Sequence, residues 1–139
     1  MTSSSTDANA YRSAVFAEAW PEALGRNPFH IITAWNPPGV VRAVTENRLA
    51  DRRLRARLRT LGAQAVRVTG CSPDMVHREP GWAAACTREH ALVLARDFGQ
   101  AAVFSVSENL LVLVWAGGKE DPLGPAMPRF DAGRDAGRM

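Results

Sequence analysis

The residues best suited to chemistry lie in one segment rich in proline, glycine and charge, residues 70–81 (GCSPDMVHREPG). Within this segment, His77 and Glu79 form an H-x-E pair. A histidine titrates near neutral pH and a carboxylate can orient or ionise it, so the pair suits general acid–base catalysis. The alternative is structural, because such a loop can be tied down by its own side-chain hydrogen bonds. Both interpretations of His77 and Glu79 stay open at this point.

Metal and thiol chemistry are the next candidates. H-x-E opens the zinc-deaminase signature, but that signature continues with P-C-x-x-C, and the chain has no C-x-x-C. Cys71, His77 and Cys86 would give a metal three soft ligands, yet their spacing matches no zinc module. Cys71 as a nucleophile would need a base, for which His77 lies in the same loop, but no helix N-terminus is expected beside it. We therefore predict no metal site and no cofactor.

Four other polar side chains could orient a ligand: Thr33, Asn36, Asn47 and Gln100. Asn36 precedes two prolines, so its side chain could instead cap a turn. Asn47 is expected on the apolar face near the start of a helix, where a buried amide without partners costs about 1–3 kcal/mol. It therefore either bonds the neighbouring loop backbone or orients a ligand. Gln100 follows a glycine at the start of a strand, where it could also cap a helix end.

The elements that position these residues follow from hydrophobic periodicity. Residues 29–35 (FHIITAW) are β-branched and aromatic, which predicts a buried strand that ends at the breaker 36–39. Apolar residues at helical spacing between residues 43 and 61 predict a helix, with Thr45 as N-cap and Gly62 as its end. Residues 11–20 fit either a strand or a helix. Further along the chain we expect a strand at 64–69, a short strand at 82–86, a helix capped by Thr87 and ended by Gly99, and a hairpin of strands at 101–106 and 110–116.

The resulting order, β-β-α-β-β-α-β-β, predicts an α/β (α+β-like) fold with a single mixed sheet of five to six strands and two main helices. We expect one domain over residues 11–116, a flexible N-terminus at 1–10 and a disordered tail at 117–139, where five glycines and three prolines accompany few apolar residues. If the strands at 29–35 and 64–69 are parallel, their carboxyl ends share one edge of the sheet. The polar candidates then converge on that rim, where open α/β sheets tend to bind ligands.

Length and composition exclude several classes of protein. The chain has 139 residues, of which 46% are hydrophobic, an ordinary balance for one globular domain. Its longest apolar run, residues 110–116, is far shorter than the roughly 20 residues that span a bilayer. The first ten residues have no basic and apolar stretch like that of a secretory signal, and two cysteines are too few for a disulfide framework. We therefore expect a reduced cytoplasmic protein that is not bound to a membrane.

The positive charge is concentrated in the predicted helix. The net charge is +3, but residues 42–59 contain seven arginines and two acidic residues, a local charge of +5, so the rest of the chain carries −2. Four of these arginines share one helix face: Arg48, Arg52, Arg55 and Arg59. Such a face is long enough to follow a nucleic-acid backbone. The alternative is a solvated helix face, since no aromatic residues alternate with the arginines and no known nucleic-acid motif is present.

Four motifs occur in order along the chain: FHIITAWNP, Glu46-Asn47, GCSPDMVHREP and FGQAAVF. In these motifs the chain resembles, over roughly residues 11–115, a bacterial family known as domain of unknown function 3293. In that family a Ser follows the E-P pair, where this chain has Gly81, so no role of that hydroxyl carries over. The resemblance implies no activity, substrate or cofactor.

We therefore predict a small bacterial domain with a pocket at one rim of its sheet that binds a small polar ligand. Asn36, Asn47, His77, Glu79 and Gln100 would line the pocket, with Thr33 and Trp35 in support, and acid–base catalysis by His77 and Glu79 is left open. The alternative is a non-enzymatic module that contacts nucleic acid or an acidic protein through the arginine-rich helix. A purely structural interaction domain would have neither a pocket nor a basic surface.

Overall fold

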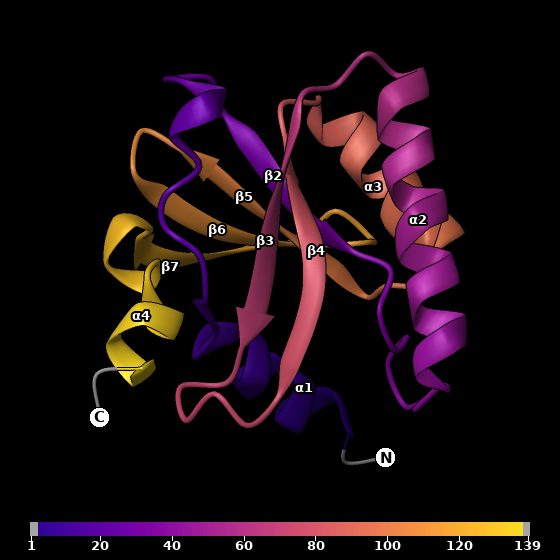
Figure 1. Ribbon diagram of the computed structural model, residues 1–139, viewed down its shortest axis with the longest axis horizontal. Coiled ribbons are helices and arrows are strands. Elements are labelled where there is room, and N and C mark those ends of the chain that lie inside the picture. The colour runs from indigo at the N-terminus through magenta and orange to yellow at the C-terminus, as the bar shows by residue number, and fades with distance from the viewer. Residues whose placement is uncertain (1–2, 138–139) are drawn as a thin grey trace.

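The computed structural model describes residues 3–137 and shows one sheet with helices on both sides (Figure 1). Its elements in chain order are α1 (Ser3–Arg12), β1 (Val15–Phe16), the 3-10 helix η1 (Glu22–Leu24), β2 (Phe29–Thr33), α2 (Val44–Thr60), β3 (Ala65–Cys71), β4 (Arg78–Ala84), α3 (Arg88–Asp97), β5 (Ala102–Ser107), β6 (Leu110–Trp115), β7 (Glu120–Pro125), the 3-10 helix η2 (Met127–Arg129) and α4 (Ala132–Gly137). No helix in this part of the chain is long and apolar enough to cross a membrane.

The sheet is antiparallel throughout its described strands, in the order β1-β3-β4-β2-β5-β6-β7. The α/β class is confirmed, but the predicted mixed sheet of five to six strands with two main helices is wrong, because seven strands and four α-helices are present over residues 3–137. β2 and β3 do run in the same direction, yet β4 lies between them and pairs with both. Their carboxyl ends therefore share one end of the sheet, as expected from a parallel arrangement.

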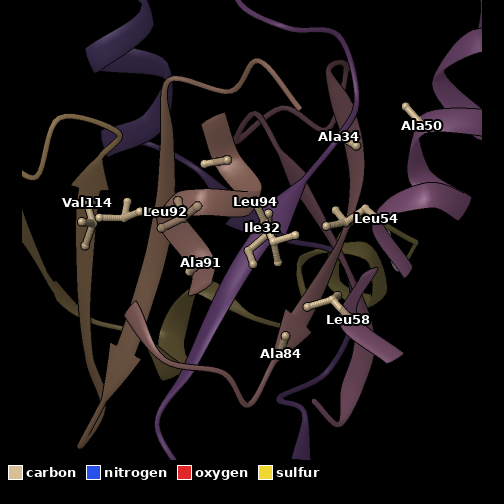
Figure 2. Packing of buried hydrophobic residues seen from close by; sticks show 12 residues of the cluster. Ile32, Ala34, Ala50, Leu54, Leu58, Ala84, Ala91, Leu92, Leu94 and Val114 are labelled. Atoms are coloured by element: carbon tan, nitrogen blue, oxygen red, sulfur yellow. The ribbon is translucent and has the colours of Figure 1, made fainter. Parts of the chain in front are cut away.

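Helices α2 and α3 cover one face of the sheet and form the first hydrophobic cluster (Figure 2). Leu54 and Leu58 of α2 pack against Ile32 of β2 and Ala84 of β4, so the predicted apolar face of this helix is the buried one. Thr45 is not the N-cap, because the helix begins at Val44.

Two glycines and one threonine set the helix boundaries as predicted. Gly62 follows α2 with φ 71°, and Gly99 follows α3 with φ 68°, a conformation that glycine adopts without strain. The Thr87 side chain caps α3 by accepting a hydrogen bond from the His90 backbone N–H.

The opposite face of the sheet carries an aromatic cluster that includes the C-terminal segment. Phe130 is 6% exposed, and its ring centroid lies 4.8 Å from that of Phe16 and 5.1 Å from that of Trp20. The prediction of a disordered tail over 117–139 is therefore wrong for its described part, which adds β7, η2 and α4. Few apolar residues were enough, because Leu123, Ala126 and Phe130 all reach this cluster.

The N-terminal segment, predicted to be flexible, is a helix in its described part. Residues Ser3–Arg12 form α1, which leads directly into β1. The Arg129 guanidinium fixes the junction between them by donating hydrogen bonds from Nη1 to the backbone oxygens of Arg12 at 2.7 Å and Ala14 at 3.0 Å. The two ends of the chain thus hold each other in place.

Half of the segment 70–81 is strand rather than loop. β3 extends to Cys71 and β4 begins at Arg78, so that Gly70 pairs with Glu79 and only residues 72–77 form the turn. The sequence predicts a later start for this strand, at residue 82, because Pro80 and Gly81 disfavour strands. Pairing with β3 along seven residues overrides that local preference and turns Glu79 from a loop residue into a strand residue.

Candidate functional site

A cleft of about 580 Å³ lies at the end of the sheet where β2 and β3 end and where β4 and β5 begin. Ile31 and Phe104, which belong to the face with the aromatic cluster, form part of its floor. The end of α1, the loop of residues 36–41 and the β3–β4 turn surround it. Figure 1 shows α1 beside the end of β3 and the β3–β4 turn. We call this hollow the rim cleft.

Five of the six candidate ligand-binding and catalytic residues lie on its wall: Thr33, Asn36, His77, Glu79 and Gln100. They come from β2, the loop after β2, the β3–β4 turn, β4 and the start of β5. Asn47 does not line the cleft and is only 1% exposed. The antiparallel register explains the convergence, since Thr33 lies opposite Gly81 on β4, two residues from Glu79.

Asn47 holds the loop that forms one wall of the cleft. Its Oδ1 accepts hydrogen bonds from the Asn36 backbone N–H at 2.9 Å and from Arg42 Nε at 3.1 Å. Its Nδ2 donates to Asn36 Oδ1 at 2.7 Å. Arg42 also donates through Nη2 to the Ala34 carbonyl. Both ends of the Asn47 amide are therefore engaged inside the protein, which favours its structural interpretation.

Thr33 is likewise engaged by the fold. Its hydroxyl donates to the Pro80 carbonyl at 2.7 Å and accepts from the Trp35 backbone N–H at 3.0 Å. Proline has no backbone N–H, so the normal ladder between β2 and β4 cannot continue at Pro80, and the threonine supplies a replacement contact. Thr33 thus shapes the cleft rather than offering a free polar group to it.

Two amide groups on the wall have atoms without a partner. Asn36 Oδ1 accepts from the Arg42 backbone N–H at 3.0 Å and from Asn47, and within residues 3–137 its Nδ2 donates to nothing. Gln100 is 6% exposed and donates through Nε2 to the Trp35 carbonyl at 3.2 Å, whereas its Oε1 accepts no hydrogen bond from the described residues. One donor and one acceptor are therefore left at the cleft.

Glu79 is the acidic group of the rim cleft. Burial raises the pKa of its carboxyl from 4.5 to about 7, and no partner in the described chain offsets this effect. Its neighbour across the strand pair is Gly70, where a Cβ would come no closer than 4.0 Å to the Glu79 carbonyl oxygen. The absence of a side chain at Gly70 leaves the carboxyl open to the cleft. A carboxyl that titrates near pH 7 can act as an acid or as a base under ordinary conditions.

His77 lies on the same wall at the end of the β3–β4 turn, where its side chain is exposed. Its backbone N–H donates to Ser72 Oγ at 3.0 Å, and Ser72 Oγ donates to Asp74 Oδ1 at 2.6 Å. The hydrogen bond from the Ser72 hydroxyl, followed by that from the Val76 N–H, lowers the pKa of Asp74. The turn is therefore tied down by its own hydrogen bonds. No hydrogen bond joins His77 to Glu79 among the described contacts, so the two are neighbours rather than a coupled pair.

The aromatic part of the cleft was not predicted from the sequence. Tyr11 of α1, Phe16 of β1 and Phe104 of β5 line it, and the rings of Tyr11 and Phe104 meet edge to face at 6.2 Å. The ambiguous pattern of residues 11–20 hid the first two, and Phe104 looked like any strand residue. At the mouth of the cleft, Val41 is 91% exposed.

The cysteines do not form a metal or nucleophile site in the described chain. Both are free, and no group of three or more histidine, cysteine or acidic residues within residues 3–137 could hold a metal ion. Burial raises the pKa of Cys71, which lines the cleft, and raises that of Cys86 to about 11. Both thiols are therefore largely protonated at neutral pH, which makes them poor nucleophiles.

The arginine face of α2 is only partly free. Arg55 lies over the ring of Trp82 at 5.3 Å, and Arg67 of β3 lies over the same ring at 3.9 Å while pairing with Asp51 at 2.7 Å. Arg48, Arg52 and Arg59 are exposed and form no ion pair within residues 3–137. Three of the four arginines are thus available to a partner.

Comparison with known proteins gives one match. The family model described as "Protein of unknown function (DUF3293)" matches residues 32–103. This stretch runs from β2 into β5 and contains all six candidate residues of the cleft and of its supporting loop. No curated protein and no solved structure matches the chain.

Proposed function

The chain belongs to this family of proteins of unknown function, DUF3293, and we propose that it binds a small ligand in the rim cleft. The observation that supports this proposal best is the unpartnered Glu79 carboxyl in a mainly apolar hollow. Buried polar groups in folded proteins nearly always have partners, so a partly buried carboxyl without one is a place where a ligand would supply the missing contact. The free Oε1 of Gln100 and the free Nδ2 of Asn36 add to the same argument.

Size and lining also fit a ligand site. Pockets for small molecules usually have volumes of roughly 300–1,000 Å³, with mostly apolar walls and a few convergent polar groups. The rim cleft has about 580 Å³ and combines Phe16, Ile31 and Phe104 with the polar groups just named. It also lies at the end of the sheet, held by side chains whose own positions are fixed, such as Thr33 and Asn47. The walls are therefore preformed, which lowers the entropic cost of binding.

Catalysis is a narrower form of the same proposal. Glu79, with a pKa of about 7, would be the acid or base, and His77 at the mouth would act only on a substrate that reaches both side chains. Binding is the first step to establish, since a reaction class would follow from the ligand.

Gly70→Leu tests the proposal by filling the cleft beside Glu79. The substitution fits the fold, because a Cβ at Gly70 meets no atom closer than 4.0 Å. We would screen a fragment library against the ¹⁵N-labelled full chain and map the amide signals that move. Fragments that bind the cleft should shift the amides around Glu79 and Gln100 in the wild type and lose this effect in Gly70→Leu.

Gly117→Leu is the matched control, because Gly117 also has open space around it and lies outside the cleft. It should bind fragments as the wild type does. If no fragment shifts the cleft amides, or if Gly70→Leu binds the same fragments equally well, the proposed function is wrong.

The exposed arginines of α2 support a second candidate, contact with nucleic acid or with an acidic protein. Arg48, Arg52 and Arg59 carry positive charge without ion pairs in the described structure, and phosphate contacts of this kind make binding strongly dependent on salt. A labelled oligonucleotide at low salt should bind the wild type and lose affinity for the double variant Arg48→Glu/Arg52→Glu. Absence of binding to the wild type at low salt would remove the nucleic-acid version of this candidate.

A further inference from the structure

We propose that the ligand of the rim cleft is an organic amine, with a cationic amino group against Glu79 and an apolar, preferably aromatic, body along Phe104 and Ile31. This inference rests on the proposed function and gives its ligand a chemical class. It follows from the charge, the hydrogen-bonding groups and the shape of the lining.

The described lining of the cleft is acidic, although the chain as a whole is basic. The chain has 17 basic and 14 acidic residues, yet among the described residues that line the cleft there is one carboxylate, Glu79, and no lysine or arginine. The arginines next to lining residues in the sequence have other partners: Arg12 pairs with Asp121 at 3.8 Å, Arg42 bonds Asn47, and Arg78 donates through Nε to the Met75 carbonyl at 3.1 Å. A phosphate or carboxylate ligand would therefore meet a carboxyl without a compensating cation, which is unfavourable in a poorly solvated site. A cation would meet an opposite charge.

The free hydrogen-bonding atoms of the lining also favour a cationic ligand. Ionised Glu79 offers two acceptor oxygens and Gln100 Oε1 offers a third, whereas Asn36 Nδ2 is the one amide donor left on the wall. An ammonium group has three N–H donors and no acceptor, which matches this set. Hydrogen bonds between charged partners are also roughly twice as strong as those between neutral ones.

The apolar part of the lining favours a ligand in which the amine is attached to an apolar body. Ile31, Ala102 and Phe104 form the floor of the cleft, and Tyr11 stands at its α1 side. A simple ammonium ion would leave this surface in contact with water. An arylalkylamine would cover it, with stacking or edge contacts to Phe104.

Proton linkage provides a check that does not depend on the choice of amine. Burial holds part of the Glu79 population protonated near pH 7, and a bound cation would favour the ionised form, so binding should release protons there. The other titratable groups that face the cleft are Tyr11 from α1, Cys71 from β3 and His77 from the turn. Glu79→Gln separates its contribution from theirs.

The test compares three probes of similar shape but different charge: 2-phenylethylamine, 2-phenylethanol and phenylacetate. Their dissociation constants would be measured at pH 8 by following the cleft amides of the full chain in NMR titrations. The amine should bind about tenfold or more tightly than the alcohol, because a charge-assisted hydrogen bond replaces a neutral one, and phenylacetate should bind least well. Calorimetry of the amine at pH 7 in buffers of different ionisation enthalpy should show proton release.

Glu79→Gln should weaken amine binding about tenfold and leave alcohol binding within about twofold, since it removes the charge and keeps the shape. Glu108→Gln, an exposed acidic residue in the β5–β6 turn, is the matched control and should change neither. Equal binding of amine and alcohol, tighter binding of phenylacetate, or no effect of Glu79→Gln would overturn the amine inference while the cleft remains a binding site. If no probe shifts the cleft amides, the amine inference fails, and failure of the fragment screen as well would reject the proposed function.

Discussion

Replacing Glu79 by glutamine should make the folded protein more stable at alkaline pH and change it little at acidic pH. The Glu79 carboxyl is partly buried among apolar residues, and burial raises its pKa from 4.5 to about 7. Glutamine has nearly the same shape and no charge, so the variant removes the cost of ionisation and keeps the packing. The unpartnered carboxyl is thus the origin of a measurable pH dependence.

The sign follows from proton binding in the two states. Between pH 4.5 and about 7 the unfolded chain has already released the Glu79 proton while the folded chain still holds it, so the stability of the wild type falls as pH rises. At about 1.4 kcal/mol per pKa unit, the full cost of ionising Glu79 in the folded state is about 3 kcal/mol. Because the cleft is open to solvent, this value is an upper limit.

The assay is urea unfolding of wild type and Glu79→Gln between pH 5 and pH 8.5, followed by tryptophan fluorescence. Taking the difference between the two proteins at each pH cancels the titration of every other group. The stability gained by the variant should grow with pH and reach about 1–3 kcal/mol above pH 7. Glu108→Gln should show no such trend. A gain that does not change with pH, or a Glu79 carboxyl that titrates near 4.5 in the NMR spectrum, would refute the reasoning.

Four further substitutions test the fold around the cleft and in the aromatic cluster. Gly81→Ala would place a Cβ 2.5 Å from the Ile32 carbonyl oxygen and should lower stability by about 1–3 kcal/mol in chemical unfolding. Gly70→Ala has room for its Cβ and should change stability by less than about 1 kcal/mol, and equal effects at the two glycines would contradict the register of β2 and β4. Asn47→Ala should cost about 1–3 kcal/mol and speed hydrogen exchange at the Asn36 amide, whereas unchanged exchange would show that Asn47 does not hold the loop. Phe130→Ala should cost about 3 kcal/mol by opening the aromatic cluster, and a neutral effect would mean that the C-terminal segment does not stabilise the fold.

The elements predicted best from the sequence are those with a complete local pattern. Helix α2 has apolar residues at helical spacing and Gly62 at its end, and the β5–β6 hairpin has a turn at Glu108 and Asn109, both with positive φ. Each of these features depends on neighbouring residues alone. Local periodicity is therefore sufficient to place them.

The errors arise where distant pairing decides the structure. β4 lies between β2 and β3 and makes the whole sheet antiparallel, a choice that depends on contacts between strands far apart in sequence. The same pairing carries Pro80 and Gly81 into a strand, although both residues usually interrupt one. The C-terminal segment was misjudged for a related reason, because Phe130 finds its partners, Phe16 and Trp20, at the other end of the chain.

The site was predictable in outline but not in the roles of its atoms. The shared end of β2 and β3 led to the expectation that Asn36, Glu79 and Gln100 lie near one another, and all three line the rim cleft. Residue type could not show that the amide of Asn47 and the hydroxyl of Thr33 are fully used within the protein, while the carboxyl of Glu79 is not. That distinction depends on which groups the folded chain brings within hydrogen-bond distance of each side chain.

The two surfaces on which function has been placed lie on different sides of the sheet, and their chemistry is opposite in sign. Helix α2 lies on one side of the sheet (Figure 1) and exposes Arg48, Arg52 and Arg59. The rim cleft is lined by residues of the face with the aromatic cluster, such as Ile31 and Phe104, and presents Glu79. None of these three arginines is among the described residues that line the cleft, and exposed charges more than about 10 Å apart are largely screened at physiological salt. Substitutions on α2 should therefore leave amine affinity unchanged, and Glu79→Gln should leave any oligonucleotide binding unchanged. If either variant affected both activities, the two surfaces would have to form one continuous binding site, and the separate assignments made for them would be incorrect.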